Sequence, residues 1–282
     1  MSETLLDVWA LYGTTYLAGV LLAALLGLVG LWIVAREQIF LGAAIGQAST
    51  LGIALVLWLG GLGAAAHLPG AASRAAADVA AVAASVTTAL WTAAPPRPDA
   101  APGEGRTAWI FLAAASLPVL LLAHSPHGLE EVTRLMSSTL LGIHERDLLA
   151  FGVLAGASAL AVARWSDRLR LLALDPAMAA AVGLRVPLWL RGVALWLGLA
   201  VGLAIRASGL VYTFGCLVLP ALVARNLCRE LRPMLWVAPA VAAGAAAAAF
   251  ALAHLADVPP AHAAVALLCA LVLATAPLRP RA

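Results

Sequence analysis

Few side chains in this sequence could do chemistry, and those that could are separated by long apolar stretches. Three of them lie close together near the C-terminal end: His254, Asp257 and His262. Imidazole and carboxylate groups are ligands for divalent cations, so these three could converge on a metal ion. The more ordinary interpretation is that they are solvated polar residues beside the Pro259-Pro260 turn.

Gln47 and Ser49 are polar side chains in a second candidate region, the run from Gly42 to Ser49 within the apolar stretch 41–60. Gly42 and Gly46 are four residues apart, and small residues at this spacing allow another helix to approach closely. Gln47 could line a transport pathway, or it could form a hydrogen bond across a pair of helices. The sequence leaves both interpretations open.

Ser49 and Ser208 could act as nucleophiles, with His254 or His262 as the general base of an intramembrane hydrolase. Nucleophilic catalysis requires such groups within hydrogen-bond reach, and no Gly-x-Ser-x-Gly motif supports this alternative. We therefore predict no catalytic residue. A secondary transporter is a further alternative, but paired broken repeats are not evident and buried acidic residues for ion coupling are scarce.

The segment from Gly209 to Pro220, with Gly215 between them, is bounded by glycine and interrupted by proline. Such broken segments place irregular backbone beside a cavity in membrane proteins. We predict that these three residues belong to a transport pathway.

The loop that begins at Asp175 contains the signals of a short helix. Asp175 can accept a hydrogen bond from a first-turn N–H, and Pro176 lacks an N–H where none is needed. Gly183 can adopt the left-handed conformation that ends a helix. These residues predict a two-turn helix over Pro176 to Val182, which either docks a soluble partner or merely orders the loop.

Composition sets the fold class. Hydrophobic residues make up 63% of the 282-residue chain and charged residues only 11%, against about 25% in soluble domains. Backbone groups in a bilayer are satisfied only in helices or closed barrels, and the apolar runs are too long for barrel strands. We predict one all-α, polytopic transmembrane bundle over residues 1–282, with eight or nine spans. The candidate spans are 9–34, 41–60, 76–92, 107–123, 147–163, 188–207, 209–224, 234–255 and 261–277.

Charge sets the expected orientation. Alternating nine spans places most arginine-containing loops on one side, which the positive-inside rule assigns to the cytoplasm. We expect a plasma (inner) membrane protein with an outside N-terminus, a cytoplasmic C-terminus and a first span that is retained. His124 to Arg146 is expected to form an interfacial helix, and the proline-rich stretch 95–104 a non-helical linker. Asp78 and Arg206 are expected to lie near span ends, where Arg206 can reach the interface.

The composition also excludes several classes of protein. All 17 positively charged residues are arginines, and a P-loop ATPase needs a lysine at the nucleotide phosphates. Nothing supports nucleic-acid binding or a cofactor. Cys216, Cys228 and Cys269 lack metal-ligand spacing and are expected to be small buried hydrophobic residues.

From Pro176 to Arg225 the sequence resembles the metal-uptake branch of ABC-transporter permeases, which handles zinc, manganese or iron. The resemblance rests on Asp175-Pro-x-x-Ala179-x-x-x-Gly183, on the spacing to Gly209, and on the run LVYTFGCLVLPALVAR that ends at Arg225. It implies a coupling helix to the ATPase, and Asp175, Pro176, Ala179 and Gly183 are the residues that define this helix, referred to below as its frame. It also implies a permease dimer in membrane lipid, a separate cytoplasmic ABC ATPase and an extracytoplasmic metal-binding protein.

The sequence departs from this family at one place. The second span of the family usually carries an Asp and, four residues later, a His, and this spacing puts both on one helix face. Ala43 and Gln47 occupy these positions here. The resemblance therefore allows three readings: a substrate other than a bare metal ion, a site elsewhere, or a partner permease that supplies the ligands.

Overall fold

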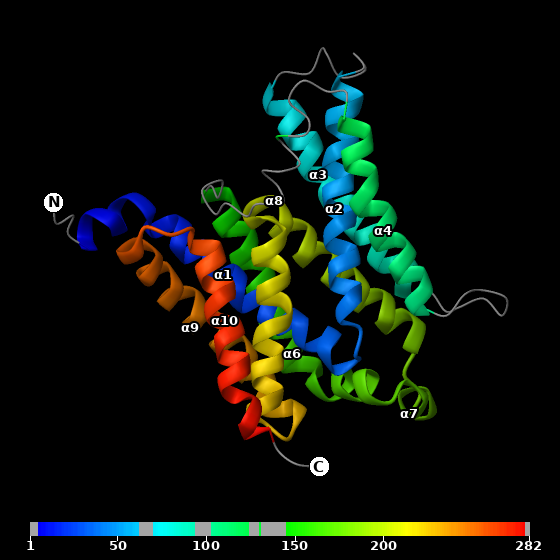
Figure 1. The fold of residues 1–282 in the computed structure, drawn as a ribbon. Coiled ribbons are helices and arrows are strands. Elements are labelled where there is room, and N and C mark those ends of the chain that lie inside the picture. Colours follow the sequence, from blue (N-terminus) through cyan, green and yellow to red (C-terminus); the bar gives the residue numbers. More distant parts are fainter. Residues whose placement is uncertain (1–4, 62–69, 94–102, 124–129, 131–144, 280–282) are drawn as a thin grey trace.

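The computed structural model describes residues 5–61, 70–93, 103–123, 130 and 145–279. The regular structure of these residues is helical, which confirms the predicted fold class (Figure 1). The helices are α1 (Leu5–Ala35), α2 (Ile39–Gly61), α3 (Gly70–Ala93), α4 (Gly103–Leu122), α6 (Glu145–Leu174), α7 (Pro176–Ala181), α8 (Val186–Leu227), α9 (Leu231–Ala256) and α10 (Pro260–Thr275), followed by the 3-10 turn η2 (Ala276–Leu278).

Eight helices in the described part of the chain are long and apolar enough to cross a bilayer. One of them, α8, has 42 residues, or about 63 Å at 1.5 Å per residue, roughly twice the thickness of a hydrocarbon core. It is interrupted at Gly209, where the backbone has φ 75° and ψ 179°. A positive φ is accessible to glycine at little cost and strains other residues.

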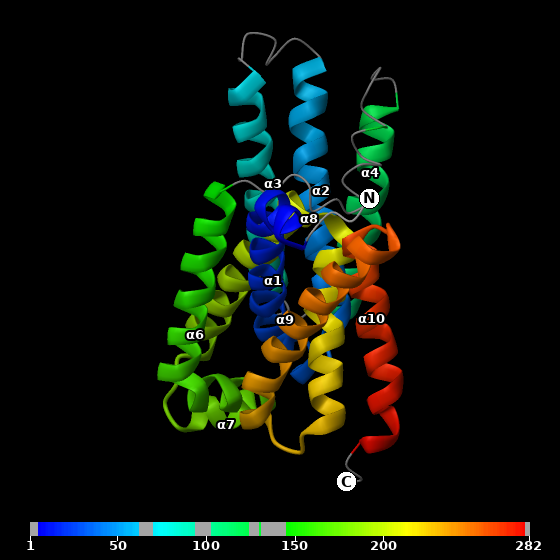
Figure 2. The same cartoon turned by 90° about the vertical axis from the view of Figure 1, so that its left-hand side faces the viewer.

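The two arms of α8 run in opposite directions on either side of Gly209, as Figure 1 shows. They correspond to the predicted spans 188–207 and 209–224, so α8 crosses the bundle twice. The start of α1 and the end of α10 accordingly lie at opposite ends of the bundle (Figure 2). Both views place α7 at the same end as the end of α10.

Helix α1 is the centre of the core. It packs against α6, α8 and α9, while α8 also contacts α2, α3 and α10. Buried Tyr212 of α8 donates a hydrogen bond to the carbonyl of Gly19 in α1 at 2.9 Å. Its ring lies 6.2 Å from that of Phe250 in α9, which lies 5.1 Å from Tyr16 in α1. These contacts join three helices at one level of the bundle.

Small residues allow the helix backbones to approach closely. A Cβ atom added at Gly30 of α1 would lie 1.6 Å from the Leu217 carbonyl oxygen of α8, and one at Gly198 of α8 would lie 2.6 Å from Cα of Val86 in α3. Close packing of this kind drives helix association in lipid, where the hydrophobic effect contributes little between helices. The glycines therefore fix how the arms of α8 sit against α1 and α3.

The turn after α1 is attached to α6. The Arg36 side chain lies 5.5 Å from the centroid of the Trp32 ring and donates a hydrogen bond to the Leu172 carbonyl at 3.5 Å. Partial burial lowers the pKa of Arg36 from its usual value. The C-terminal end of α6 is thereby held beside the end of α1.

Several predictions about local structure need correction. Helix α4 already begins at Gly103, so Gly103 and Glu104 are helical and do not belong to the non-helical linker. Cys216 is buried, but Cys228 is half-buried and Cys269 is exposed; none of the three forms a disulfide. The predicted interfacial helix over 124–146 lies outside the described residues, apart from residue 130 and the start of α6.

We expect Gly30→Ala to destabilise the protein by about 2 kcal/mol or more, because the methyl group would collide with a backbone carbonyl that cannot move independently. Gly244→Ala in α9 is the matched control, since nothing lies within 4 Å of a Cβ at that position. The melting temperature of the detergent-purified variants measures the difference. Equal melting of the two variants would contradict the close contact between α1 and α8.

Candidate functional site

Helix α7 is capped at both ends. The Asp175 side chain accepts a hydrogen bond from the Met178 N–H at 2.9 Å, and Pro176 opens the helix. At the other end, Gly183 has φ 85°, its N–H donates to the Ala180 carbonyl, and the Leu184 N–H donates to the Ala179 carbonyl, both at 3.0 Å. This pair of bonds is a Schellman motif. The predicted helix over Pro176 to Val182 is confirmed, with Val182 as its C-terminal cap.

Only one face of α7 is attached to the bundle. Ala179 is fully buried, whereas the Met178 side chain is 53% exposed and Val182 is 60% exposed. Met178 and Val182 are four residues apart, so they form a small apolar surface on the side of α7 opposite the bundle. Sequence reasoning identified the frame of this helix, and the structure adds the outward position of Met178.

The backbone around the reversal of α8 is held by hydroxyl groups. Ser208 donates a hydrogen bond to the Ala204 carbonyl at 2.9 Å, and its Oγ lies 3.2 Å from Oγ1 of Thr213. Both hydroxyl groups are buried, and together they bridge the two arms across Gly209. The reversal is therefore stabilised by local polar contacts in a region that contains little water.

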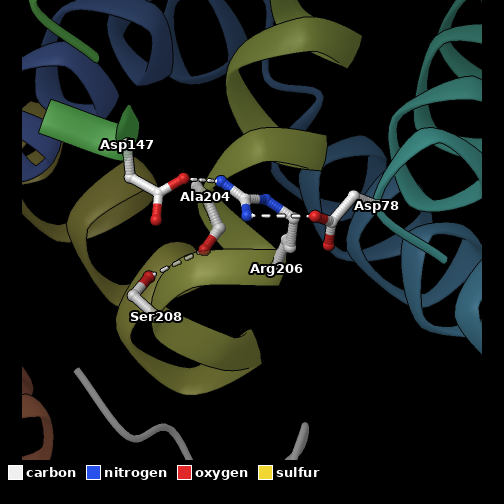
Figure 3. A network of polar contacts seen from close by, with 5 residues as sticks. All are labelled: Asp78, Asp147, Ala204, Arg206 and Ser208. Carbon is white, nitrogen blue, oxygen red and sulfur yellow. Dashed lines mark hydrogen bonds and ion pairs between the residues drawn. The ribbon is translucent and has the colours of Figure 1, made fainter. Parts of the chain in front are cut away.

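Arg206 is the centre of a charged network beside the reversal (Figure 3). One guanidinium nitrogen contacts Asp147 at the start of α6, and the other lies 3.3 Å from Oδ2 of Asp78 in α3. The Asp147 side chain is 7% exposed, that of Arg206 is 21% exposed and that of Asp78 is 44% exposed. Arg206 therefore pairs with two carboxylates in addition to lying near the end of its span.

The network joins three helices that are far apart in the sequence. A buried ion loses its hydration, so the pair with Asp147 persists only because the charges compensate each other. Asp78 is more exposed and contributes less. The sequence contained one weak signal of this network: Arg206 lies three residues before the predicted break at Gly209. It could not show which carboxylates Arg206 would meet.

Gln47 and Ser49 do not point toward the same place. Residues two positions apart on a helix lie on nearly opposite faces. The neighbouring Gly46 faces Leu210 and Ile205 of α8, which places this side of α2 against the reversal. Gln47 and Ser49 are both buried, and neither Oε1 of Gln47 nor Oγ of Ser49 has a hydrogen-bond partner among the described residues. A pathway role for Gln47 and Ser49 stays a prediction.

The remaining candidates of the α8 segment have packing roles. A Cβ at Gly215 would lie 2.6 Å from the Val265 side chain, so Gly215 is the contact point between α8 and α10. Pro220 was expected to interrupt the span, but it is buried within α8, and the non-helical residue of α8 is Gly209. The predicted break is thus correct at Gly209 and wrong at Pro220. A pathway role for these residues stays a prediction.

The described residues contain no group of three or more His, Cys, Asp or Glu side chains arranged to hold a metal ion. His254, Asp257 and His262 are all described, and they do not form such a group. Asp257 instead ends α9 in the left-handed conformation, with φ 51°. The structure therefore favours the ordinary interpretation of these three residues as polar residues at a turn.

The hydrolase alternative also lacks its geometry. The Ser208 hydroxyl donates to a backbone carbonyl, and its side-chain neighbour is Thr213. Ser49 has no hydrogen-bond partner at all in the described part of the protein. Neither serine contacts a histidine there, so no nucleophile and base are paired.

Comparison with protein families matches residues 10–278 to the ABC 3 transport family. The chain belongs to the ABC 3 transport family. It is therefore a multi-pass membrane permease, and the predicted class of protein is confirmed. As an ABC 3 permease it is a transport subunit and not an enzyme, which removes the support for a hydrolase or a secondary transporter.

Two solved structures share the fold of this ABC 3 permease. PsaBC from Streptococcus pneumoniae in complex with a Fab is 17% identical, with a TM-score of 0.75 over 93% of this chain and 90% of that chain. A transporter assigned to the metal-chelate type of ABC transporter, in an inward-facing conformation, is 16% identical, with a TM-score of 0.71 over 98% and 89%. Comparison with curated proteins gave no match.

We expect Arg206→Met to destabilise the permease by on the order of 3 kcal/mol, because it removes the arginine charge that the buried Asp147 carboxylate contacts. The double variant Arg206→Met, Asp147→Asn should recover part of the loss, whereas Asp78→Asn alone should cost under about 1 kcal/mol. Thermal unfolding of the purified variants gives these values. Exposed Arg232→Met is the control, and strictly additive single and double effects would contradict the network.

Proposed function

We propose that this permease carries a metal ion or a metal complex across the membrane, driven by a separate ATPase that docks on α7. Family membership and a fold shared with a transporter of the metal-chelate type support the substrate class. The observation that carries the docking role is the doubly capped, outward-facing α7.

The geometry of α7 suits the transmission of force. A helix of six residues has little stability of its own, so its position depends on its caps and on buried Ala179. It lies between the end of α6 and the start of α8 in the chain. The first arm of α8 then leads to the Arg206 network and to the reversal at Gly209. A displacement of α7 by a bound ATPase would thus reach the opposite end of the bundle through one continuous helix.

The distribution of arginine supports an inward position for α7. Most described arginines lie at the α7 end of the bundle: Arg36, Arg106, Arg164, Arg168, Arg170, Arg185, Arg191, Arg225, Arg229, Arg232 and Arg279. Asp78, Asp147 and Asp257 lie toward the other end. By the positive-inside rule this distribution supports a cytoplasmic position for α7 and the C-terminus and an N-terminus outside the inner membrane.

Two further partners belong to this proposal. An extracytoplasmic metal-binding protein would deliver substrate at the end of the bundle that holds the reversal of α8. A second permease, identical or related, would complete the pathway, because Oε1 of Gln47 and Oγ of Ser49 in α2 have no hydrogen-bond partner among the described residues of one chain. Either kind of second permease is compatible with the residues described.

The substrate is more consistent with a metal complex, or with metal ligands supplied by the second permease, than with a bare ion bound by this chain alone. Ala43 offers no ligand, and Gln47 offers a neutral amide where the resemblance implies an imidazole. The Oε1 atom of Gln47 is a buried acceptor that a hydrogen-bond donor on a metal complex would satisfy.

We expect cells that lack the gene to contain less of one transition metal than wild-type cells, measured by mass spectrometry of whole-cell metal content. If the substrate is a metal complex, the deficit should appear when the metal is supplied as a chelate and be small when it is supplied as the free ion. An unchanged content of all transition metals under both conditions would contradict transport of a metal.

We expect Met178→Glu to abolish binding of the ATPase, because a charge replaces an apolar contact on the exposed face of α7, while the melting temperature of the permease is unchanged. Leu278→Glu is the matched control, since Leu278 is 63% exposed at the same end of the bundle but outside α7. Co-purification and substrate-stimulated ATP hydrolysis are the measurements.

The frame of α7 provides an independent test. Asp175→Ala removes the N-terminal cap at a cost of about 1 kcal/mol, and Gly183→Val forces a β-branched residue to φ 85°. Both should uncouple ATP hydrolysis from transport. Normal complex assembly and transport in the double variant would overturn the docking role of α7.

A further inference from the structure

A cavity of about 310 Å³ lies between α6 and the first arm of α8, beside the α7 end of the bundle. Helix α6 packs mainly on α1 and makes few contacts with α8, so the two helices leave space between them. Leu154, Ala157 and Ala161 line it from α6, and Trp189, Gly192 and Trp196 line it from α8. The Cβ position at Gly192 has no atom within 4 Å, so the space continues up to the α8 backbone.

The interior of this cavity offers no free polar group among the described residues. Trp196 donates a hydrogen bond from Nε1 to Oγ of Ser158 at 2.7 Å, and Ser158 donates to the Leu154 carbonyl at 2.6 Å. Ser158 and Trp196 are therefore satisfied by the protein, whereas Trp165 and Trp189, whose indole rings also line the cavity, belong to its rim. A bound molecule would be stabilised here by its hydrocarbon groups. A polar group of that molecule would lose its hydrogen bonds to water without gaining new ones in the cavity.

The rim of the cavity at the α7 end is aromatic and basic. Trp165 and Trp189 meet edge to face, with ring centroids 5.8 Å apart, and the Arg168 guanidinium lies 5.9 Å from the centroid of the Trp189 ring. Arg164 and Arg191 are exposed and adjoin lining residues in sequence. Tryptophan favours the level of the lipid headgroups, and clustered arginines attract anionic headgroups. The nearby Asp167 is already paired with Arg170.

We propose that this cavity binds one acyl chain of an anionic phospholipid, whose phosphate lies against Arg168 and its neighbouring arginines at the rim. The satisfied apolar interior selects the hydrocarbon chain, and the positive rim selects the headgroup charge. Helix α6 changes direction at Trp165, with φ −126° and ψ 18°, so the lipid is bound where α6 turns toward α7. The bound lipid keeps α6 and the first arm of α8 apart, and α7 connects these two helices in the chain.

Native mass spectrometry of the purified permease tests the binding, with palmitoyl-oleoyl phosphatidylglycerol and palmitoyl-oleoyl phosphatidylcholine as the probes. We expect the wild-type protein to retain one phosphatidylglycerol in preference to phosphatidylcholine. Gly192→Leu fills the cavity and should reduce this retention by about tenfold or more, because it displaces several methylene groups. Arg168→Gln should reduce the preference for phosphatidylglycerol by about fivefold.

Gly244→Leu is the matched control, because it also adds a side chain in open space but on α9, and it should retain lipid like the wild type. Equal retention by the Gly192→Leu and Gly244→Leu variants would overturn the proposal. So would equal binding of the two lipids by the wild type, or a disulfide formed between two permease copies through Ala157→Cys. These measurements use the permease without its ATPase, so they do not depend on the docking role of α7.

Discussion

The reversal of α8 at Gly209 is the constraint on which the rest of the structure depends. It brings two arms of one helix into the middle of the bundle, where the first arm meets α3 through Gly198 and the second meets α1 through Gly30. Only glycine readily adopts the backbone conformation at this turn. Because no hydrophobic force drives helices together in lipid, these close backbone contacts and the buried Tyr212 hydrogen bond determine how the spans are arranged.

The charged network stabilises the same region from the other side. Arg206 lies one turn before the reversal and binds carboxylates of α3 and α6, so three helices are tied together at the end of the bundle opposite α7. The first arm of α8 is consequently anchored at both ends, by the network at one and by the loop that carries α7 at the other. In an ABC 3 permease, such an arm is suited to carry movement from one side of the membrane to the other.

The fold and the site differ in how far they could be predicted. The span limits followed from apolar runs because each run needed only its own length and composition. The frame of α7 followed from Asp175, Pro176 and Gly183 because caps act within one or two turns of their own helix. Pro220 was misjudged, since buried α8 tolerates a proline without a break. Whether His254, Asp257 and His262 converge could not be predicted, because closeness in sequence does not ensure that side chains meet, and the described residues form no such group.

By itself the sequence determined that this protein is a helical membrane bundle, that a capped helix follows Asp175 and that the chain breaks at Gly209, because these features depend on local composition and backbone preference. Only the tertiary structure decided that Arg206 meets Asp147 and Asp78, that Gln47 and Ser49 are buried with unpartnered oxygens, and that a cavity separates α6 from α8. Those outcomes depend on how distant helices pack against one another, and the apolar periodicity of a membrane span carries little information about its neighbours.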